Sequence, residues 1–343
     1  MFVEPYLQDL RAARYRPRAA ARYVWLCLHL ASEAAVHRPR ALRSVLLAGL
    51  GHLVVLMLVA AAVSFLVDRR LAVEYFIFSS WWLIGGLAWI TFHLRMFRTD
   101  EELFLTGLGL PNFLTLGRLL AIPAFYLFIV EQHESLALVA FLSGALSDVA
   151  DGVAARRLDA STRMGRIFDP IVDVLFNVGV VMGLTRAGYL PEWILTLVFI
   201  RYGLLMFGAA WIYITHGPVA IRPTVLGKTA GVVTTGLVLS VVLARIFLQP
   251  DPAGQLIELL DLALGFVLLL TTVQVVIIGI YNLRHAGHVP EAHGPMAVIL
   301  GKPAEGEGAS LPVEAPAASP PRHAARPRSE PEEDLFRPPP PDR

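Results

Sequence analysis

The chain has 343 residues, of which 55% are hydrophobic and 17% charged, and its mean hydropathy of +0.59 excludes an ordinary soluble domain. With 29 Lys and Arg against 28 Asp and Glu, the net charge of +1 gives no overall basic field that would favour nucleic acid as a partner. The single cysteine, Cys27, excludes an intramolecular disulfide and any zinc or iron–sulfur site built from several cysteines. The N-terminal region lacks the layout of a cleaved signal peptide, so we expect the apolar segments to be permanent.

Residues 1–43 form a basic segment before the first apolar run. Its pattern predicts a basic, partly amphipathic helix around Tyr23–Val36. Two interpretations are open: a helix lying on the anionic inner leaflet, or an anchor that only sets the membrane orientation. The arginines of this segment are Arg11, Arg14, Arg16, Arg18, Arg22, Arg38, Arg40 and Arg43.

Eight apolar runs are long enough to cross about 30 Å of hydrocarbon as helices. Short loops with Pro or Gly separate them, which predicts a compact all-α membrane bundle. The runs lie near 44–67, 71–93, 112–130, 136–155, 167–186, 191–214, 228–248 and 255–281.

Arginine placement predicts the orientation of the bundle. The positive-inside rule puts the basic N-terminal segment in the cytoplasm, and an even number of spans returns the C-terminus there. Arg69, Arg70 and Arg186 fall on the predicted outer side and are exceptions. The Arg- and Ala-rich composition, with lysine only at 228 and 302, is typical of a GC-rich bacterial genome, so we expect the inner membrane.

Residues 286–343 are rich in Pro and Ala and cannot bury enough apolar area to offset the loss of chain entropy. We expect a disordered, solvated tail, with recruitment of a partner as the alternative.

Four aspartates stand out because acids at a membrane edge are costly and usually functional. Asp148 and Asp151 are three residues apart near the inner end of one predicted helix, and Asp169 and Asp173 are four apart near the start of the next. Each pair therefore lies on one helical face, and the short connection makes the two helices antiparallel neighbours. The sequence predicts that all four carboxylates converge just inside the cytoplasmic boundary.

Convergent carboxylates need a compensating cation, and all-oxygen ligation favours Mg²⁺ or Mn²⁺, as one or two ions. Gly152, Ala155 and Gly165 keep space free beside the acids, and Arg156 suits a pyrophosphate. The alternative interpretation is that the aspartates cap helix ends and pair with nearby arginines.

The spacing of these residues resembles the signature of the CDP-alcohol phosphatidyltransferase family. Two further stretches fit this resemblance, PNFLTLGRLLAIP at 111–123 and LGKT at 226–229. It implies a six-helix core over 105–285, with two additional membrane helices over 44–93. The matching pattern is Asp148-x2-Asp151-Gly152-x2-Ala155-Arg156-x8-Gly165-x3-Asp169-x3-Asp173.

The resemblance implies a metal-dependent transfer of a phosphatidyl group from CDP-diacylglycerol to an alcohol, with release of CMP in phospholipid biosynthesis. Asp148, Asp151, Asp169 and Asp173 would bind the metal, and Asp173 would also be the general base. The nucleotide and its diphosphate would lie against Gly152, Ala155, Arg156 and Gly165. The resemblance also makes a homodimer plausible.

Four cations could hold an anionic acceptor such as sn-glycerol 3-phosphate: Arg118, Arg201, Arg222 and Lys228. The PN-x-LT-x2-R stretch and the arginine of the sixth span resemble phosphatidylglycerophosphate synthases and related cardiolipin synthases. Val172, Val174 and Tyr202 depart from the residues common there, so inositol phosphate, phosphatidylglycerol or an unusual polyol stay open as acceptors.

Two other functions compete. A CDP-choline or CDP-ethanolamine aminoalcohol phosphotransferase would not need the acceptor-side cations. A transporter or a silent scaffold is disfavoured, because the acids gather at one membrane face and the signature is intact.

Overall fold

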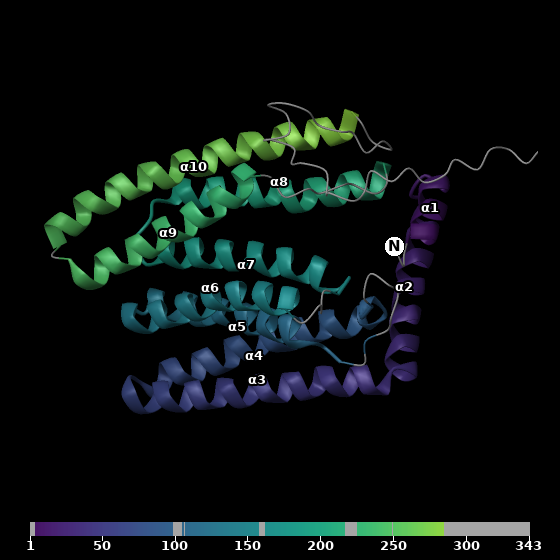
Figure 1. The fold of residues 1–343 in the computed structure, drawn as a ribbon, viewed down its shortest axis with the longest axis horizontal. Coiled ribbons are helices and arrows are strands. Elements are labelled where there is room, and N and C mark those ends of the chain that lie inside the picture. Colours follow the sequence, from purple (N-terminus) through teal and green to yellow (C-terminus); the bar gives the residue numbers. More distant parts are fainter. Residues whose placement is uncertain are drawn as a thin grey trace, which may run out of the picture. The chain divides into compact units, whose positions relative to one another are not determined.

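The computed structural model describes residues 4–98, 105, 107–157, 162–216, 225–248 and 250–284. Its helices follow one another along the chain (Figure 1). They are α1 Glu4–Ala12, α2 Pro17–His37, α3 Pro39–Leu66, α4 Arg69–Phe92, the 3-10 helix η1 Leu94–Met96, α5 Leu110–Val130, α6 Glu134–Arg157, α7 Gly165–Arg186, α8 Glu192–His216, α9 Val225–Phe247 and α10 Pro250–Arg284.

Local sequence signals explain where several helices begin and end. Proline occupies the first turn of α2, α3 and α5, where its missing N–H is no loss. The tight turn before α4 is capped by Asp68, whose carboxylate accepts from the backbone N–H groups of Arg70 at 2.8 Å and Leu71 at 3.1 Å. Gly188 ends α7 with a φ of 78°, a left-handed conformation that glycine adopts without strain.

In the described part of the chain, seven helices are long and apolar enough to cross a membrane: α3, α4, α5, α6, α7, α8 and α10. The chain is therefore a multi-pass integral membrane protein, and the all-α fold predicted from the apolar runs is confirmed. The expected eighth span, 228–248, is also a helix, α9, but its apolar stretch within the described residues, Thr229–Ala244, is shorter than a full span.

Helix α5 forms the centre of the core. Of its most apolar window 67% is buried, more than in any other candidate span, and α5 packs against α4, α6 and α7. Small residues allow this close approach. A Cβ at Gly179 of α7 would lie 2.4 Å from Ile122 Cγ2 of α5, and a Cβ at Gly183 would lie 2.9 Å from Ile129 Cγ2.

Two further groups of helices flank this core. Helix α3 packs on α4, while α8 and α9 pack on α10. Successive long helices alternate in direction. One end of the bundle, which we call the α2 end, therefore holds the start of α3, α5 and α7 and the end of α4, α6 and α8 (Figure 1).

The basic N-terminal segment is helical, as predicted, and α1 and α2 run crosswise to the long helices at the α2 end (Figure 1). Arg11 donates to the carbonyl oxygens of Tyr213 at 2.6 Å and Ile214 at 2.7 Å, and the Tyr15 hydroxyl donates to Ile214 at 2.8 Å. Carbonyl groups in the last turn of a helix commonly lack helical donors, and these bonds satisfy two such groups of α8. The predicted tail, 286–343, lies outside the described residues.

Candidate active site

A polar stripe on α5 faces the predicted carboxylates. Asn112, Thr115 and Arg118 are three residues apart and therefore share one face of the helix. All three are buried, with Arg118 only 2% exposed, in a helix that is otherwise almost wholly apolar. Buried polar groups in such a helix need partners, and the partners of these side chains lie mainly on α6 and α7.

Arg118 gathers carboxylates from both neighbouring helices. Its Nη2 atom forms an ion pair with Asp148 Oδ1 at 2.9 Å and also contacts Asp151, both on α6, while its Nη1 atom contacts Asp173 on α7. The planar guanidinium suits this role because its N–H groups point in fixed directions toward several acceptors. The predicted convergence of Asp148, Asp151 and Asp173 is thus present at the α2 end of the bundle.

Thr115 links the fourth carboxylate to this group. Its hydroxyl oxygen lies 2.8 Å from Asp169 Oδ1 and 3.3 Å from Asp151 Oδ2. Since Asp169 is on α7 and Asp151 on α6, one side chain of α5 spans the gap between the two acid pairs. Pro170, between Asp169 and Asp173, has no backbone N–H, so α7 lacks the helical hydrogen bond that residue 170 would donate to the carbonyl four residues earlier.

Gly165 begins α7 where another side chain needs its space. A Cβ there would lie 2.9 Å from Asn112 Oδ1 and 3.6 Å from Asp169 Oδ2. The backbone N–H of Gly165 donates to the Thr162 hydroxyl at 2.9 Å, and Asn112 Nδ2 lies 3.3 Å from the same hydroxyl. Glycine therefore keeps a narrow polar space open beside Asp169.

The donor set fits a hard divalent cation. Four carboxylates face one guanidinium, so the cluster keeps an excess of negative charge, and the buried Asn112 Oδ1 adds an oxygen with no hydrogen-bond partner in the described part of the chain. Within those same residues the acids are not arranged as a ready set of three metal ligands, because they are spread around Arg118 and Thr115.

Among the described side chains of the long helices, Arg201 is the second buried cation. It lies on α8, is 9% exposed, and has its guanidinium 5.1 Å from the ring centroid of Tyr202. Its Nε and Nη1 atoms have no hydrogen-bond partner among the described residues. Tyr202 also interacts electrostatically with Asp173 of α7, the helix against which α8 packs.

The structure describes the other predicted site residues to different extents. Gly152 lies on α6 immediately after Asp151. Ala155 and Arg156 lie on the last turns of α6, and Lys228 on the first turn of α9, but their side chains are outside the described part of the chain. Arg222 falls wholly outside it.

The structure places Arg118 among the acids, whereas the sequence predicted Arg118 only as a cation that would contact the acceptor. Thr115 and Asn112 were not predicted as site residues at all. Their signal was the three-residue spacing with Arg118 within an apolar helix, a pattern that places polar groups on one face.

Comparison with known proteins agrees with this geometry. Residues 108–274 match the family model described as CDP-alcohol phosphatidyltransferase. The chain is 46% identical over 72 residues to a CDP-diacylglycerol-glycerol-3-phosphate 3-phosphatidyltransferase of Aquifex aeolicus, which covers 20% of this chain and 39% of the relative. It is 33% identical over 129 residues to a cardiolipin synthase (CMP-forming) of Streptomyces coelicolor, which covers 36% of this chain and 60% of the relative.

The matched part of the chain thus spans less than two thirds of the length of these curated relatives. No solved structure matches the chain significantly. The family match contains α5, α6 and α7, and with them all four aspartates and the polar stripe of α5. Residues 108–274 are therefore similar to a CDP-alcohol phosphatidyltransferase domain, and the candidate site lies within them.

Proposed function

We propose that the chain transfers a phosphatidyl group from CDP-diacylglycerol to the free hydroxyl of sn-glycerol 3-phosphate, releasing CMP. The observation that carries the proposal is the meeting of four carboxylates from α6 and α7 around Thr115 and Arg118 of α5, inside the matched domain. The basic segment at the same end of the bundle supports a reaction at the cytoplasmic face of a bacterial inner membrane.

Asp173 is the general base in this proposal. One of its oxygens contacts Arg118, yet the side chain is 46% exposed, so an acceptor hydroxyl can reach it. Asp173 takes the proton of that hydroxyl while the hydroxyl oxygen bonds to the phosphorus of the phosphatidyl group. The bond from that phosphorus to the bridging diphosphate oxygen breaks, and CMP leaves with the electron pair.

Asp148, Asp151, Asp169 and Asp173 would hold Mg²⁺ or Mn²⁺, as one or two ions. When bound, the cation would offset the charge of the diphosphate oxygens during the displacement. Gly165 leaves room beside Asp169, and with Gly152, Ala155 and Arg156 it would receive the cytidine diphosphate. Arg118 keeps the acids together and orients Asp173, a role that adds to its proposed contact with the acceptor.

Arg201 would bind the phosphate of the acceptor. A guanidinium that is nine-tenths buried is costly unless an anion pairs with it, and Arg201 lies over the ring of Tyr202, a residue that interacts electrostatically with Asp173. Arg222 and Lys228 would complete this anion site. Phosphatidylglycerol is the second candidate acceptor, since its phosphodiester is also anionic and one relative is named a cardiolipin synthase.

The remaining organisation is proposed as the sequence predicts it: a catalytic core over 105–285, additional membrane helices over 44–93, and a tail over 286–343. A homodimer, also expected from the family resemblance, is tested by the mass of the purified protein in detergent.

Release of CMP by the purified full chain tests the function. CDP-diacylglycerol is supplied with Mg²⁺ or Mn²⁺, and sn-glycerol 3-phosphate, phosphatidylglycerol, serine and myo-inositol 1-phosphate are offered in parallel. Release with glycerol 3-phosphate alone supports the proposal, and release with phosphatidylglycerol alone selects the second candidate. Reaction of CDP-choline with diacylglycerol, without any of these, would contradict both and indicate an aminoalcohol phosphotransferase.

A further inference from the structure

Helices α3 and α4 precede the matched residues 108–274, yet α4 packs on the central helix α5. Gly86 of α4 lies directly against α5, since a Cβ there would be 2.7 Å from Leu119 Cδ2 and 2.9 Å from Leu116 Cδ1. A small residue at this position lets the two helices approach closely. The additional helices are therefore packed into the part of the bundle that holds the acids.

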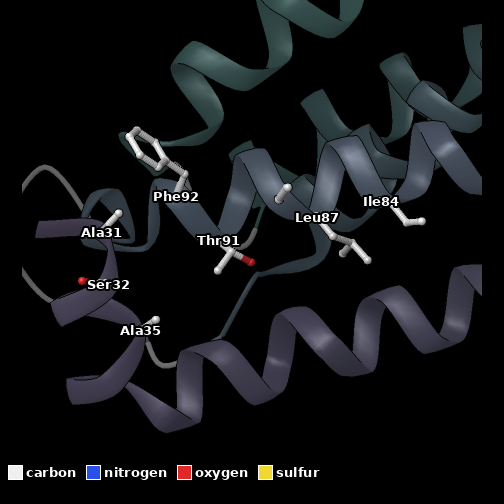
Figure 2. A pocket seen from close by; sticks show the side chains of 8 residues that line it. Ala31, Ser32, Ala35, Ile84, Leu87, Thr91 and Phe92 are labelled. Atoms are coloured by element: carbon white, nitrogen blue, oxygen red, sulfur yellow. The ribbon is translucent and has the colours of Figure 1, made fainter. Parts of the chain in front are cut away.

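Two faces of α4 meet different partners. An apolar groove of about 530 Å³ lies between α4 and α2 (Figure 2). Trp89 is not among the residues that line this groove and packs instead against the buried core of the bundle. The residues of α4 that line the groove are Ile84, Leu87, Ala88, Thr91 and Phe92.

The ring of Trp89 stacks on Phe168 of α7. The two ring centroids are 4.9 Å apart, and the ring planes differ by 23°. Phe168 is 3% exposed and directly precedes Asp169, one of the four acids. Because Phe168 and Asp169 are consecutive residues of one helix, a contact that holds the Phe168 ring also holds the backbone that carries the Asp169 carboxylate.

The start of α7 needs support from outside the helix. The first N–H groups of a helix have no acceptor within it. Gly165 is a poor helix former, and Pro170 has no N–H to donate. Asp169 lies between these two positions, so its own segment of the chain holds it weakly.

The chain that follows α4 makes a second connection to this segment. The carbonyl of Arg98 accepts a hydrogen bond from the backbone N–H of Arg163 at 3.1 Å. Arg163 lies two residues before Gly165, in the connection from α6 to α7. One ring contact and one backbone hydrogen bond thus converge on the start of α7.

Helix α3 reaches the same place through a series of hydrogen bonds. The backbone N–H of Leu108 donates to Ser44 Oγ of α3 at 2.9 Å, and the Leu108 carbonyl accepts from Asn112 Nδ2 at 2.6 Å. The same Asn112 nitrogen lies 3.3 Å from the Thr162 hydroxyl, which accepts from the N–H of Gly165. Both additional helices are therefore connected to the start of α7.

We propose that α3 and α4 position the metal ligands, and that Trp89 is the main positioning residue. Acting through Phe168, Trp89 fixes Asp169 where its Oδ1 atom lies 2.8 Å from the Thr115 hydroxyl. The inference rests on the proposed function, because it takes Asp169 as a ligand of Mg²⁺ or Mn²⁺. Replacing a residue that orients a metal ligand typically weakens metal binding about 10–100-fold.

Binding of Mn²⁺ to the purified full chain in detergent, without either substrate, tests the inference. The free ion is measured by electron paramagnetic resonance. Trp89→Leu removes the ring and should weaken Mn²⁺ binding about tenfold. Trp89→Phe keeps a ring that can stack on Phe168 and should restore most of the affinity. Higher Mn²⁺ concentrations should recover CMP release by Trp89→Leu, because the weakened site then fills by mass action.

Tyr75→Leu is the matched control. Tyr75 is 3% exposed and stacks on Phe128 of α5, with ring centroids 5.4 Å apart, but it lies near the start of α4 and away from the α2 end. Its loss should lower thermal stability and leave Mn²⁺ affinity unchanged.

Three results would overturn the inference while the proposed function stands: full Mn²⁺ affinity in Trp89→Leu, an equal loss in Tyr75→Leu, or no recovery in Trp89→Phe. An unaltered chain that binds no Mn²⁺ would instead contradict the proposed metal site, and the inference with it.

Discussion

Replacing Arg118 with glutamine should destabilise the protein in a way that a divalent cation reverses. The substitution removes the one positive side chain that the described structure places among Asp148, Asp151 and Asp173. Glutamine is uncharged, is shorter than arginine and offers two N–H donors in place of five, so the charge and most of the contacts with the acids are lost together. The carboxylates would then repel one another without a counter-charge.

The magnitude follows from how exposed each ion pair is. The pair with Asp151 is almost fully buried, since its side chain is 9% exposed, and breaking such a pair costs about 3–5 kcal/mol. The partners Asp148 and Asp173 are 59% and 46% exposed, so water screens these pairs and each adds no more than about 1 kcal/mol. The pair with Asp151 therefore sets most of the loss.

Thermal unfolding of the full chain in detergent, followed by tryptophan fluorescence in EDTA, measures this loss. At about 2 °C per kcal/mol, Tm should fall by roughly 6 °C or more. The control Arg70→Gln breaks an exposed ion pair with Glu74 and should shift Tm by no more than about 1–2 °C.

Mn²⁺ should restore most of the stability of Arg118→Gln, because the acids regain a cation. A variant as stable as the unaltered protein in EDTA would refute the electrostatic reasoning. A loss that Mn²⁺ leaves unchanged would refute the fit of this donor set to a metal.

Three further substitutions test other parts of the site. Asp173→Asn should lower kcat by about 10²–10⁴-fold while the protein still gains thermal stability from Mn²⁺; near-normal turnover would exclude the general-base role. Gly165→Ala puts a Cβ 2.9 Å from Asn112 Oδ1 and should cost about 1–3 kcal/mol of unfolding free energy, whereas Gly203→Ala, with open space around its Cβ, should be neutral or slightly stabilising in the same thermal melt. Arg201→Gln should mainly raise KM for the phosphorylated acceptor, and a selective rise in KM for CDP-diacylglycerol would move Arg201 to the donor site.

Sequence alone predicted the membrane helices closely. The expected run 112–130 corresponds to α5 at Leu110–Val130, and 167–186 to α7 at Gly165–Arg186. Hydropathy succeeds here because lipid forces the backbone to satisfy its own hydrogen bonds, so a long apolar run has almost no alternative to a helix. The run 228–248 is also helical, but its apolar stretch among the described residues is shorter than the predicted span.

The sequence also determined the two acid pairs. The three-residue spacing of Asp148 and Asp151 and the four-residue spacing of Asp169 and Asp173 fix a common face on each helix, and the short connection makes those helices neighbours. These are local relations, which a repeat of 3.6 residues per turn dictates without knowledge of the packing.

Only the tertiary structure decided what lies between the acid pairs and what the added N-terminal helices form. Arg118 and Thr115 reach both pairs because α5 packs against α6 and α7 at once, and neighbouring positions in the chain do not specify such a three-helix contact. The apolar groove between α2 and α4 likewise depends on how a crosswise helix meets the end of α4. Helical periodicity assigns a face to every residue, but the partner of that face is set by packing between segments distant in the sequence.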